Sequence, residues 1–249
     1  MNREPARRAL AEALGTGLLV TVVVGSGITA QRLSPGDIGL ELLENSTATM
    51  LGLAVLILIL GPVSGAHFNP VVTLADCALG RRTGTGVSPA TAALFIPAQI
   101  VGGIGGAVLA NLMFSLPPVT LATHVRAGGH LWLGEVVATA GLILLIFALA
   151  RTGRSTYGPA AVGAYIGAAY WFTSSTSFAN PAVTIARAFT NTFAGIAPDS
   201  ITGFIAAQLL GAGLGTALVI LFFPHHPTPA RPLAPIEQTA APTIARTAP

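Results

Sequence analysis

Six long runs of apolar residues dominate the chain, and short polar or proline- and glycine-rich segments separate them. About 20 apolar residues in a helix cross a hydrocarbon core of ~30 Å. Because the runs are continuously apolar and do not alternate, they predict helices rather than the strands of a transmembrane β-barrel. The predicted spans are Ala9–Ala30, Ser46–Gly61, Ala90–Phe114, Leu131–Ala150, Ala160–Phe172 and Ile201–Phe223, of which the second and fifth are short.

The composition agrees with an integral membrane protein whose surroundings are a lipid bilayer. Only 8% of the 249 residues are charged and 52% are hydrophobic, whereas about 25% of the residues of a typical soluble domain are charged. The single cysteine, Cys77, excludes a disulfide scaffold. The net charge of +3 comes from few residues and forms no basic patch, so nucleic acid is not expected as a partner.

The arginines predict the orientation of the six spans, which place both termini on the same side. Nine of them would lie on the side of the termini, namely Arg3, Arg7, Arg8, Arg81, Arg82, Arg151, Arg154, Arg231 and Arg246. The opposite side would receive Arg32, Arg126 and Arg187. The positive-inside rule therefore predicts a multi-pass protein of the inner or plasma membrane with both termini in the cytoplasm.

The two halves of the chain share three landmarks in the same order. Residues 69–73 (NPVVT) recur at 180–184 (NPAVT), residues 95–99 (FIPAQ) recur at 204–208 (FIAAQ), and Glu12 with Thr16 recurs as Glu135 with Thr139. Ordered repetition of this kind indicates a duplication. Because each half carries three spans, the second half enters the membrane inverted, and inverted repeats place the functional pathway at their interface.

The domain organisation follows from this repeat. We expect one membrane-spanning domain over residues 1–223, with repeats at about 8–114 and 130–223. Residues 224–249 are rich in proline, alanine and threonine and have no periodic apolar face. Such a composition predicts a disordered tail, which the orientation above places in the cytoplasm.

Two nine-residue stretches, Val71–Leu79 and Ala182–Thr190, are too short to span the membrane. Each follows an Asn-Pro pair, and because asparagine is a favoured N-cap and proline a favoured first helical residue, both pairs predict helix starts. Half-helices entering from opposite faces would bring their positive N-terminal ends and two asparagine amides together at the centre. Such a centre orients water, opposes cations and proton conduction, and lets neutral molecules pass.

The residues around these pairs resemble the aquaporin, or major intrinsic protein, family. The resemblance rests on SGAHFNPVVT at residues 64–73 and NPA at residues 180–182, and it extends over about residues 8–223. It implies an all-α membrane protein with six transmembrane helices and two re-entrant half-helices, a pore in every protomer and usually a homotetramer. No cofactor or metal is expected. The pore constriction would comprise Asn69, Pro70, Val71, Asn180, Pro181 and Ala182, with Val71 where alanine is usual.

The resemblance also implies an outer selectivity filter, reached by counting from the two motifs. Its four positions fall at Thr49, at Ala168 or the neighbouring Gly167, at Ser177 and at Val183. The family's arginine is replaced by Val183, and its usual bulky aromatic residue and histidine are missing, so a wide filter is expected. Arg187, one turn beyond Val183, is expected in the outer vestibule, either replacing the missing arginine or marking the membrane interface.

Three polar side chains inside the apolar segments need a separate explanation. A charge within a span costs at least ~2.5–3.5 kcal/mol unless it is partnered. We expect Glu12 and Glu135 each to accept backbone N–H bonds from the half-helix loop of its own repeat, as the family pattern implies. The alternative is that either glutamate carries protons in a coupled transporter. His67 precedes Asn69 by two residues and is expected to narrow the cytoplasmic vestibule.

These patterns together predict a passive channel for water and small uncharged solutes. Glycerol-like polyols and neutral metalloid hydroxides such as arsenite fit a wide filter without arginine. A proton-coupled secondary transporter that uses Glu12 or Glu135 is the alternative function, and a structural or adhesive membrane protein is a third. An enzyme is least expected, because no nucleophile–base pair and no metal-ligand cluster lies within the spans.

Overall fold

The computed structural model describes residues 4–81 and 84–224, and within these ranges the regular secondary structure is entirely helical. The long helices are α1 (Glu4–Leu33), α2 (Ile38–Ser64), α4 (Pro89–Met113), α5 (Gly129–Arg151), α6 (Gly158–Phe172) and α8 (Pro198–Phe222). Five of them are long and apolar enough to cross a membrane. The sixth, α6, has 15 residues and continues directly from a 3₁₀ turn, η1 (Ser155–Tyr157). The predicted all-α architecture is confirmed, whereas residues 225–249 of the predicted tail lie outside the described ranges.

Helix α2 begins eight residues before the predicted Ser46 because its polar first turns are partnered. Asp37 caps the helix by accepting a hydrogen bond from the Leu40 backbone N–H at 3.0 Å. Glu44 accepts a bond from the Ser34 hydroxyl at 2.9 Å, and the Asn45 amide donates to the Val23 carbonyl at 2.8 Å. A span boundary set by hydropathy leaves out these polar turns. With them included, α2 is a helix of 27 residues, long enough to cross the membrane.

Two short helices begin at the Asn-Pro pairs, as predicted: α3 (Pro70–Gly80) and α7 (Pro181–Ala186). Helix α7 is shorter than the predicted 182–190, because the chain tightens into a 3₁₀ turn, η2 (Arg187–Phe189). The carbonyls of this turn bond to the loop between α4 and α5. The Ala188 oxygen accepts from Ala122 N–H at 2.9 Å, and the Phe189 oxygen accepts from Thr120 N–H at 3.2 Å. A longer α-helix would use these carbonyls internally.

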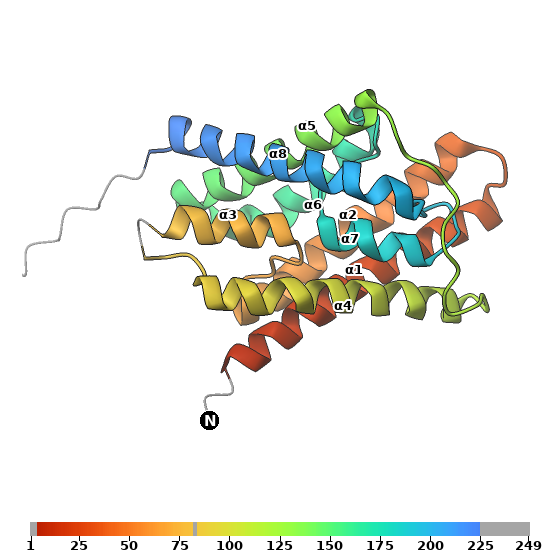
Figure 1. Ribbon diagram of the computed structural model, residues 1–249, viewed down its shortest axis with the longest axis horizontal. Helices are drawn as coiled ribbons and strands as arrows, with labels where there is room; N and C mark the ends of the chain where they lie inside the picture. The colour runs from red at the N-terminus through yellow and green to blue at the C-terminus, as the bar shows by residue number, and fades with distance from the viewer. Residues whose placement is uncertain (1–3, 82–83, 225–249) are drawn as a thin grey trace, which may run out of the picture.

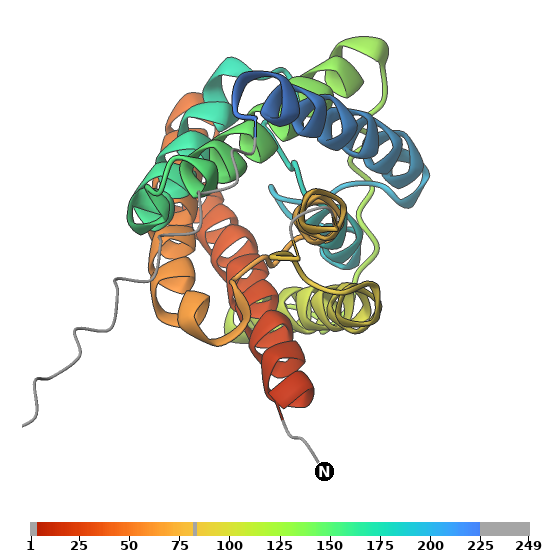
Figure 2. The same cartoon turned by 90° about the vertical axis from the view of Figure 1, so that its left-hand side faces the viewer.

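The two short helices lie end to end between α4 and α8 (Figure 1). In the view along the long axis, α7 lies behind α3 and the long helices are arranged around the pair (Figure 2). Helix α1 packs against α4 and α2, while α5 packs against α8 and α2 packs against α6. The half-helices thus pack against α4 of the first half and α8 of the second half of the chain.

Glycines allow the long helices of each half to approach closely. A Cβ atom on Gly106 of α4 would lie 2.0 Å from the Gly17 carbonyl oxygen of α1. In the second half, a Cβ atom on Gly215 of α8 would lie 2.6 Å from the Ala140 carbonyl oxygen of α5. Both distances are shorter than any allowed contact. Small residues at such crossings let helices pack by van der Waals contact in lipid, where the hydrophobic effect does not drive their association.

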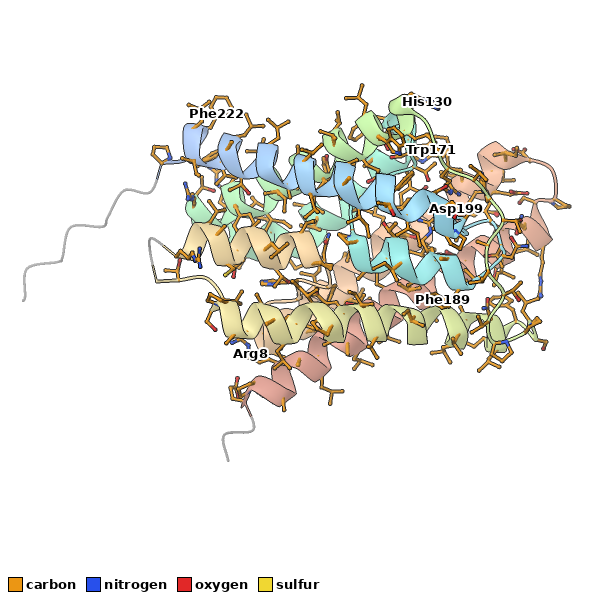
Figure 3. All side chains as sticks on the ribbon, viewed as in Figure 1. Arg8, His130, Trp171, Phe189, Asp199 and Phe222 are labelled. Carbon is orange, nitrogen blue, oxygen red and sulfur yellow. The ribbon has the colours of Figure 1, made fainter. Side chains whose placement is uncertain are left out.

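The molecule has two distinct ends along its long axis. Arg8 near the start of α1 and Phe222 at the end of α8 lie at one end, here named the Arg8 end (Figure 3). His130, Trp171 and Asp199 lie toward the other, here named the His130 end (Figure 3). The first and last described helices therefore begin and finish at the same end, which an even number of spans requires.

Candidate functional site

A cavity of about 500 Å³ lies where the two halves of the chain meet. Its lining includes Ser155 and Pro159, which follow α5 at the Arg8 end, and Tyr170 and Arg187 toward the His130 end. Asn69 and Asn180 line it between these groups. The cavity therefore extends along the axis past the facing starts of α3 and α7.

The two asparagines brace each other's loops across the centre of this cavity. The Asn69 amide nitrogen donates to the Ala179 carbonyl at 2.7 Å, and the Asn180 amide nitrogen donates to the Phe68 carbonyl at 2.8 Å. Their oxygens cap the helices that follow, since Asn69 accepts from Val71 N–H at 3.1 Å and Asn180 accepts from Ala182 N–H at 3.0 Å. A side-chain amide has two N–H donors. Each asparagine therefore keeps one donor for a molecule in the cavity.

Glu12 is completely buried and accepts hydrogen bonds from the loop that precedes α3. Its two oxygens accept from the backbone N–H groups of His67 and Phe68 at 3.0 and 2.7 Å. The Ser64 hydroxyl and the Gln99 amide donate to it at 2.6 and 2.8 Å. Four charge-assisted bonds of this kind satisfy a buried carboxylate without a cation.

Glu135 has the same environment in the second half. It accepts from the backbone N–H groups of Phe178 and Ala179, both at 2.8 Å. The Ser175 hydroxyl and the Gln208 amide donate to it at 2.7 and 2.6 Å. Neither Glu135 nor Glu12 is among the residues that line the cavity. The two carboxylates therefore contact the loops, not the contents of the pathway.

These loops need such partners because their backbone is strained. Ala66 and Phe68 in the first loop have φ angles of 50°, and Ser177 and Ala179 in the second have φ angles of 50° and 49°. Non-glycine residues rarely adopt this left-handed region and do so at a cost of about 1–3 kcal/mol each. The hydrogen bonds to the two glutamates compensate for that cost and hold both Asn-Pro starts in place.

Three of the four predicted filter residues line the cavity toward the His130 end, namely Thr49, Ser177 and Val183. The fourth position is wrong. Ala168 is exposed on α6 and does not line the cavity. Gly167 is no substitute, because it packs against Met50 of α2, whose Sδ atom would lie 2.9 Å from a Cβ atom on this glycine.

The residue that α6 places on the cavity is Tyr170. Its hydroxyl donates to the Thr49 hydroxyl at 3.4 Å, and both side chains are buried. Pro159, Val162, Ile166 and Tyr170 all line the cavity, at the three- and four-residue spacing of one helical face. This spacing was the sequence signal that could have identified Tyr170 as a cavity residue, because Ala168 does not lie on the same helical face. Tyr170 therefore adds an aromatic ring to this part of the cavity, at a position that the count from the two motifs did not reach.

Arg187 also lines the cavity, one turn beyond Val183, and its guanidinium lies over the Phe178 ring at 3.5 Å from the centroid. Arg126, in the loop between α4 and α5, lies 5.3 Å from the centroid of the same ring. Burial lowers the pKa of Arg126 to about 10, so it stays charged at neutral pH. Burial, and then the charges of Arg126 and Arg187, lower the pKa of His124. His124 is therefore neutral at neutral pH, and the guanidinium groups of Arg126 and Arg187 supply the positive charge of this region.

His67 lines the cavity near the Arg8 end, in agreement with the vestibule position expected for it. Its Nδ1 atom lies 3.0 Å from the Thr73 hydroxyl oxygen, and its Nε2 atom lies 3.9 Å from an Asp76 carboxylate oxygen. Asp76 accepts a hydrogen bond from the Val87 backbone N–H at 2.7 Å. Asp76, which joins the segment before α4 to α3, was not identified from the sequence.

Comparisons with known proteins agree with this geometry. The family described as Major intrinsic protein matches residues 2–177. The chain is 51% identical to the aquaglyceroporin AqpS of Rhizobium meliloti (strain 1021) over 237 residues, which covers 95% of this chain and 96% of that protein. It is 33% identical to aquaporin-2 of Homo sapiens, with 88% and 80% of the two chains covered.

A solved structure has the same fold. The aquaglyceroporin from Plasmodium falciparum superimposes with a TM-score of 0.62 and covers 86% of this chain and 95% of its own. The sequence identity of that pair is 18%, so the similarity concerns the arrangement of the helices.

Proposed function

The chain belongs to the major intrinsic protein family, and from that premise we propose that its central cavity is the pore of a passive channel for water and small uncharged solutes. Members of this family are membrane channels and not enzymes. Glycerol is the solute suggested by the relative named as an aquaglyceroporin. Neutral metalloid hydroxides such as arsenite are a further class of solute that we propose from their size and lack of charge.

The observation that supports this function best is the pair of asparagine donors in one cavity. Asn69 and Asn180 are fixed by bonds to the opposite loops, so their free N–H groups have a defined direction. A water molecule that accepts from both asparagines turns its oxygen toward them and cannot transmit a proton along the axis. A passing hydroxyl-bearing solute finds the same two donors. Neutral molecules are therefore favoured over ions.

The proton-coupled transporter fits the geometry less well. A proton carrier must exchange protons with the pathway, whereas Glu12 and Glu135 do not line the cavity and each accept four hydrogen bonds. Protonation would place a hydroxyl against backbone donors. We propose that both carboxylates stabilise the loops.

We propose that the outer constriction is formed by Thr49, Tyr170, Ser177 and Val183. All four line the cavity toward the His130 end, and three of them carry hydroxyl groups. Hydroxyls beside an apolar wall suit polyols, whose oxygens and carbon chain need different partners. The tyrosine ring makes this constriction narrower than the small set of residues expected from the sequence.

The membrane setting completes the proposal. We propose that the Arg8 end faces the cytoplasm of an inner or plasma membrane, because the order of the predicted spans assigns nine of the 12 arginines to the side of the termini. The channel assembles as a homotetramer in which every protomer has its own pore. Apolar residues such as Leu51 and Val55 of α2 are exposed on the isolated protomer and are suited to lipid or to a neighbouring copy.

The test is stopped-flow light scattering on proteoliposomes of the unmodified protein, with gradients of water, glycerol, urea and arsenite. We expect water and glycerol to permeate faster than through protein-free liposomes. Fast water flux with complete exclusion of glycerol would contradict the solute range. Flux no faster than through protein-free liposomes for all four would contradict the channel itself.

The position of Tyr170 gives a second prediction. A Tyr170→Ala variant removes the aromatic ring from the constriction, and we expect glycerol permeability to rise about fivefold, which corresponds to a barrier lower by ~1 kcal/mol. The same stopped-flow assay, normalised to the amount of protein, measures this change. The matched control is Ala168→Leu, which changes an exposed residue two positions away on the same helix. An effect of Ala168→Leu without an effect of Tyr170→Ala would contradict the corrected filter.

A further inference from the structure

Arg187 is a buried cation at the wall of the cavity. It belongs to η2, and only 3% of its surface is exposed. Its Nε–H donates to the Ala194 carbonyl, and the guanidinium plane lies over the Phe178 ring. One hydrogen bond and one ring contact therefore fix the side chain. Of its five N–H donors, only the Nε–H is used by the hydrogen bond to Ala194.

The remaining donors of Arg187 have no protein partner in the described part of the chain. Within residues 4–81 and 84–224, no carboxylate forms an ion pair with this guanidinium, and its two terminal amino groups donate to no protein atom. Buried charges are normally paired, because an isolated one loses its hydration without compensation. Since Arg187 lines the cavity, its free N–H groups are available to the molecules inside it.

A second unsatisfied group lies on the same cavity. The Ser177 side chain is 3% exposed, and its hydroxyl oxygen is buried without a hydrogen-bond partner among the described residues. The Tyr170 and Thr49 hydroxyls, which are bonded to each other at 3.4 Å, line the cavity as well. Apolar Val23 and Val183 also contribute to its lining. The site thus combines a guanidinium and hydroxyls with an aliphatic surface.

We propose that Arg187 takes the place of the arginine that Val183 displaces, and that it binds solute oxygens together with Ser177. The proposal rests on the proposed channel function. Arginine offers only donors, in a fixed fork, so its ligand is a solute with two or more acceptor oxygens, such as a vicinal diol. The same charge repels cations that enter from the His130 end.

The experiment compares Arg187→Met and Arg187→Lys with the unmodified channel in proteoliposomes. The first measurement is the ratio of glycerol to urea permeability, because glycerol offers three acceptor oxygens and urea one. The second is proton flux, followed with an entrapped pH-sensitive dye under an imposed membrane potential. The matched control is Arg32→Met, which removes an exposed arginine that does not line the cavity.

Arg187→Met is expected to lower the glycerol-to-urea ratio about tenfold, the factor for losing one hydrogen bond to a charged group. It is also expected to raise proton flux above that of the unmodified channel. Arg187→Lys keeps the charge but not the fork, so it should retain low proton flux while lowering the ratio. This second variant decides the matter if the methionine variant fails to fold. Arg32→Met should change neither measure.

Unmodified values of the glycerol-to-urea ratio in both Arg187 variants would overturn the proposal, as would an unchanged proton flux in a folded Arg187→Met channel. A failure of the proposed channel function has a different signature. In that case the unmodified protein itself would pass no glycerol above protein-free liposomes.

Discussion

A Glu135→Ala channel is expected to lose most of its folded protein and, with it, most of its permeability. The substitution leaves the backbone N–H groups of Phe178 and Ala179 without their acceptor, together with one N–H of the Gln208 amide, whose nitrogen also donates to the Thr184 hydroxyl. A buried donor that loses its partner costs about 1–3 kcal/mol. Three such donors lie next to a backbone that is already strained at Ser177 and Ala179. We therefore expect their combined cost to destabilise the loop before α7 and, with it, the folded protein.

The measurement is the thermal stability of the purified protein in detergent, together with the permeability of the same preparation in liposomes. Glu12→Ala should cause a loss of similar size, because its four donors match those of Glu135. The control is Glu4→Ala, which removes an exposed carboxylate paired with Arg7 at 2.8 Å and should cost no more than about 1 kcal/mol. A stable Glu135→Ala protein that lost only a pH dependence of uptake would instead favour the transporter.

A Val183→Arg channel is expected to pass glycerol much more slowly than the unmodified channel. Val183 is 5% exposed and lines the cavity beside the other constriction residues. A guanidinium at this position enters the space next to Tyr170 and adds a second charge one turn from Arg187. We expect glycerol permeability to fall about tenfold or more, corresponding to a barrier higher by ~1.4 kcal/mol. Because water is smaller, we expect the water permeability to fall far less than the glycerol permeability.

Stopped-flow measurements of water and glycerol on the same vesicles give this comparison directly. A Val183→Met variant is the uncharged control, since it lengthens the side chain without adding a charge or a donor. It should reduce glycerol flux less than Val183→Arg. An equal proportional loss of water and glycerol in Val183→Arg would show that this position does not select by size.

The sequence predicted those parts of the site that depend on local chemistry. The starts of α3 and α7 were predictable because Asn69 and Asn180 cap the helices that follow them, and an N-cap acts within three residues. That Glu12 and Glu135 need partners followed from the cost of a charge within an apolar helix, whereas their contacts with the loops were implied by the family resemblance. Only the helix starts depend on a short segment, because the loops bonded to Glu12 and Glu135 lie 55 and 43 residues away along the chain.

The predictions that failed depend on geometry between elements. Counting back from Asn180 to Ala168 assumed a loop length between α6 and α7, and an error of two residues turns the helix by about 200°. The position therefore moved from the cavity-facing Tyr170 to an exposed face. The early end of α7 likewise depends on residues 120 and 122 of a distant loop, which bond to the η2 carbonyls. Neither effect has a local sequence signal.

The two halves show how far a repeat can be used for prediction. Ser64, Phe68 and Gln99 contact Glu12 in the same way that Ser175, Ala179 and Gln208 contact Glu135. Apart from Asn69 and Asn180, the side chains discussed above that line the cavity differ between the halves, because selectivity requires different groups at the two ends. The duplicated positions therefore indicate the scaffold, and the positions that are not duplicated, such as Tyr170 and Arg187, indicate the candidate filter.

The most direct test of the channel is the dependence of glycerol flux on its driving force. Proteoliposomes of the unmodified protein are exposed to increasing glycerol gradients, with and without a pH gradient across the membrane. A passive pore predicts an initial flux that rises in proportion to the glycerol gradient and does not respond to the pH gradient. Flux that saturates and is driven by the pH gradient would contradict the account and identify a coupled transporter.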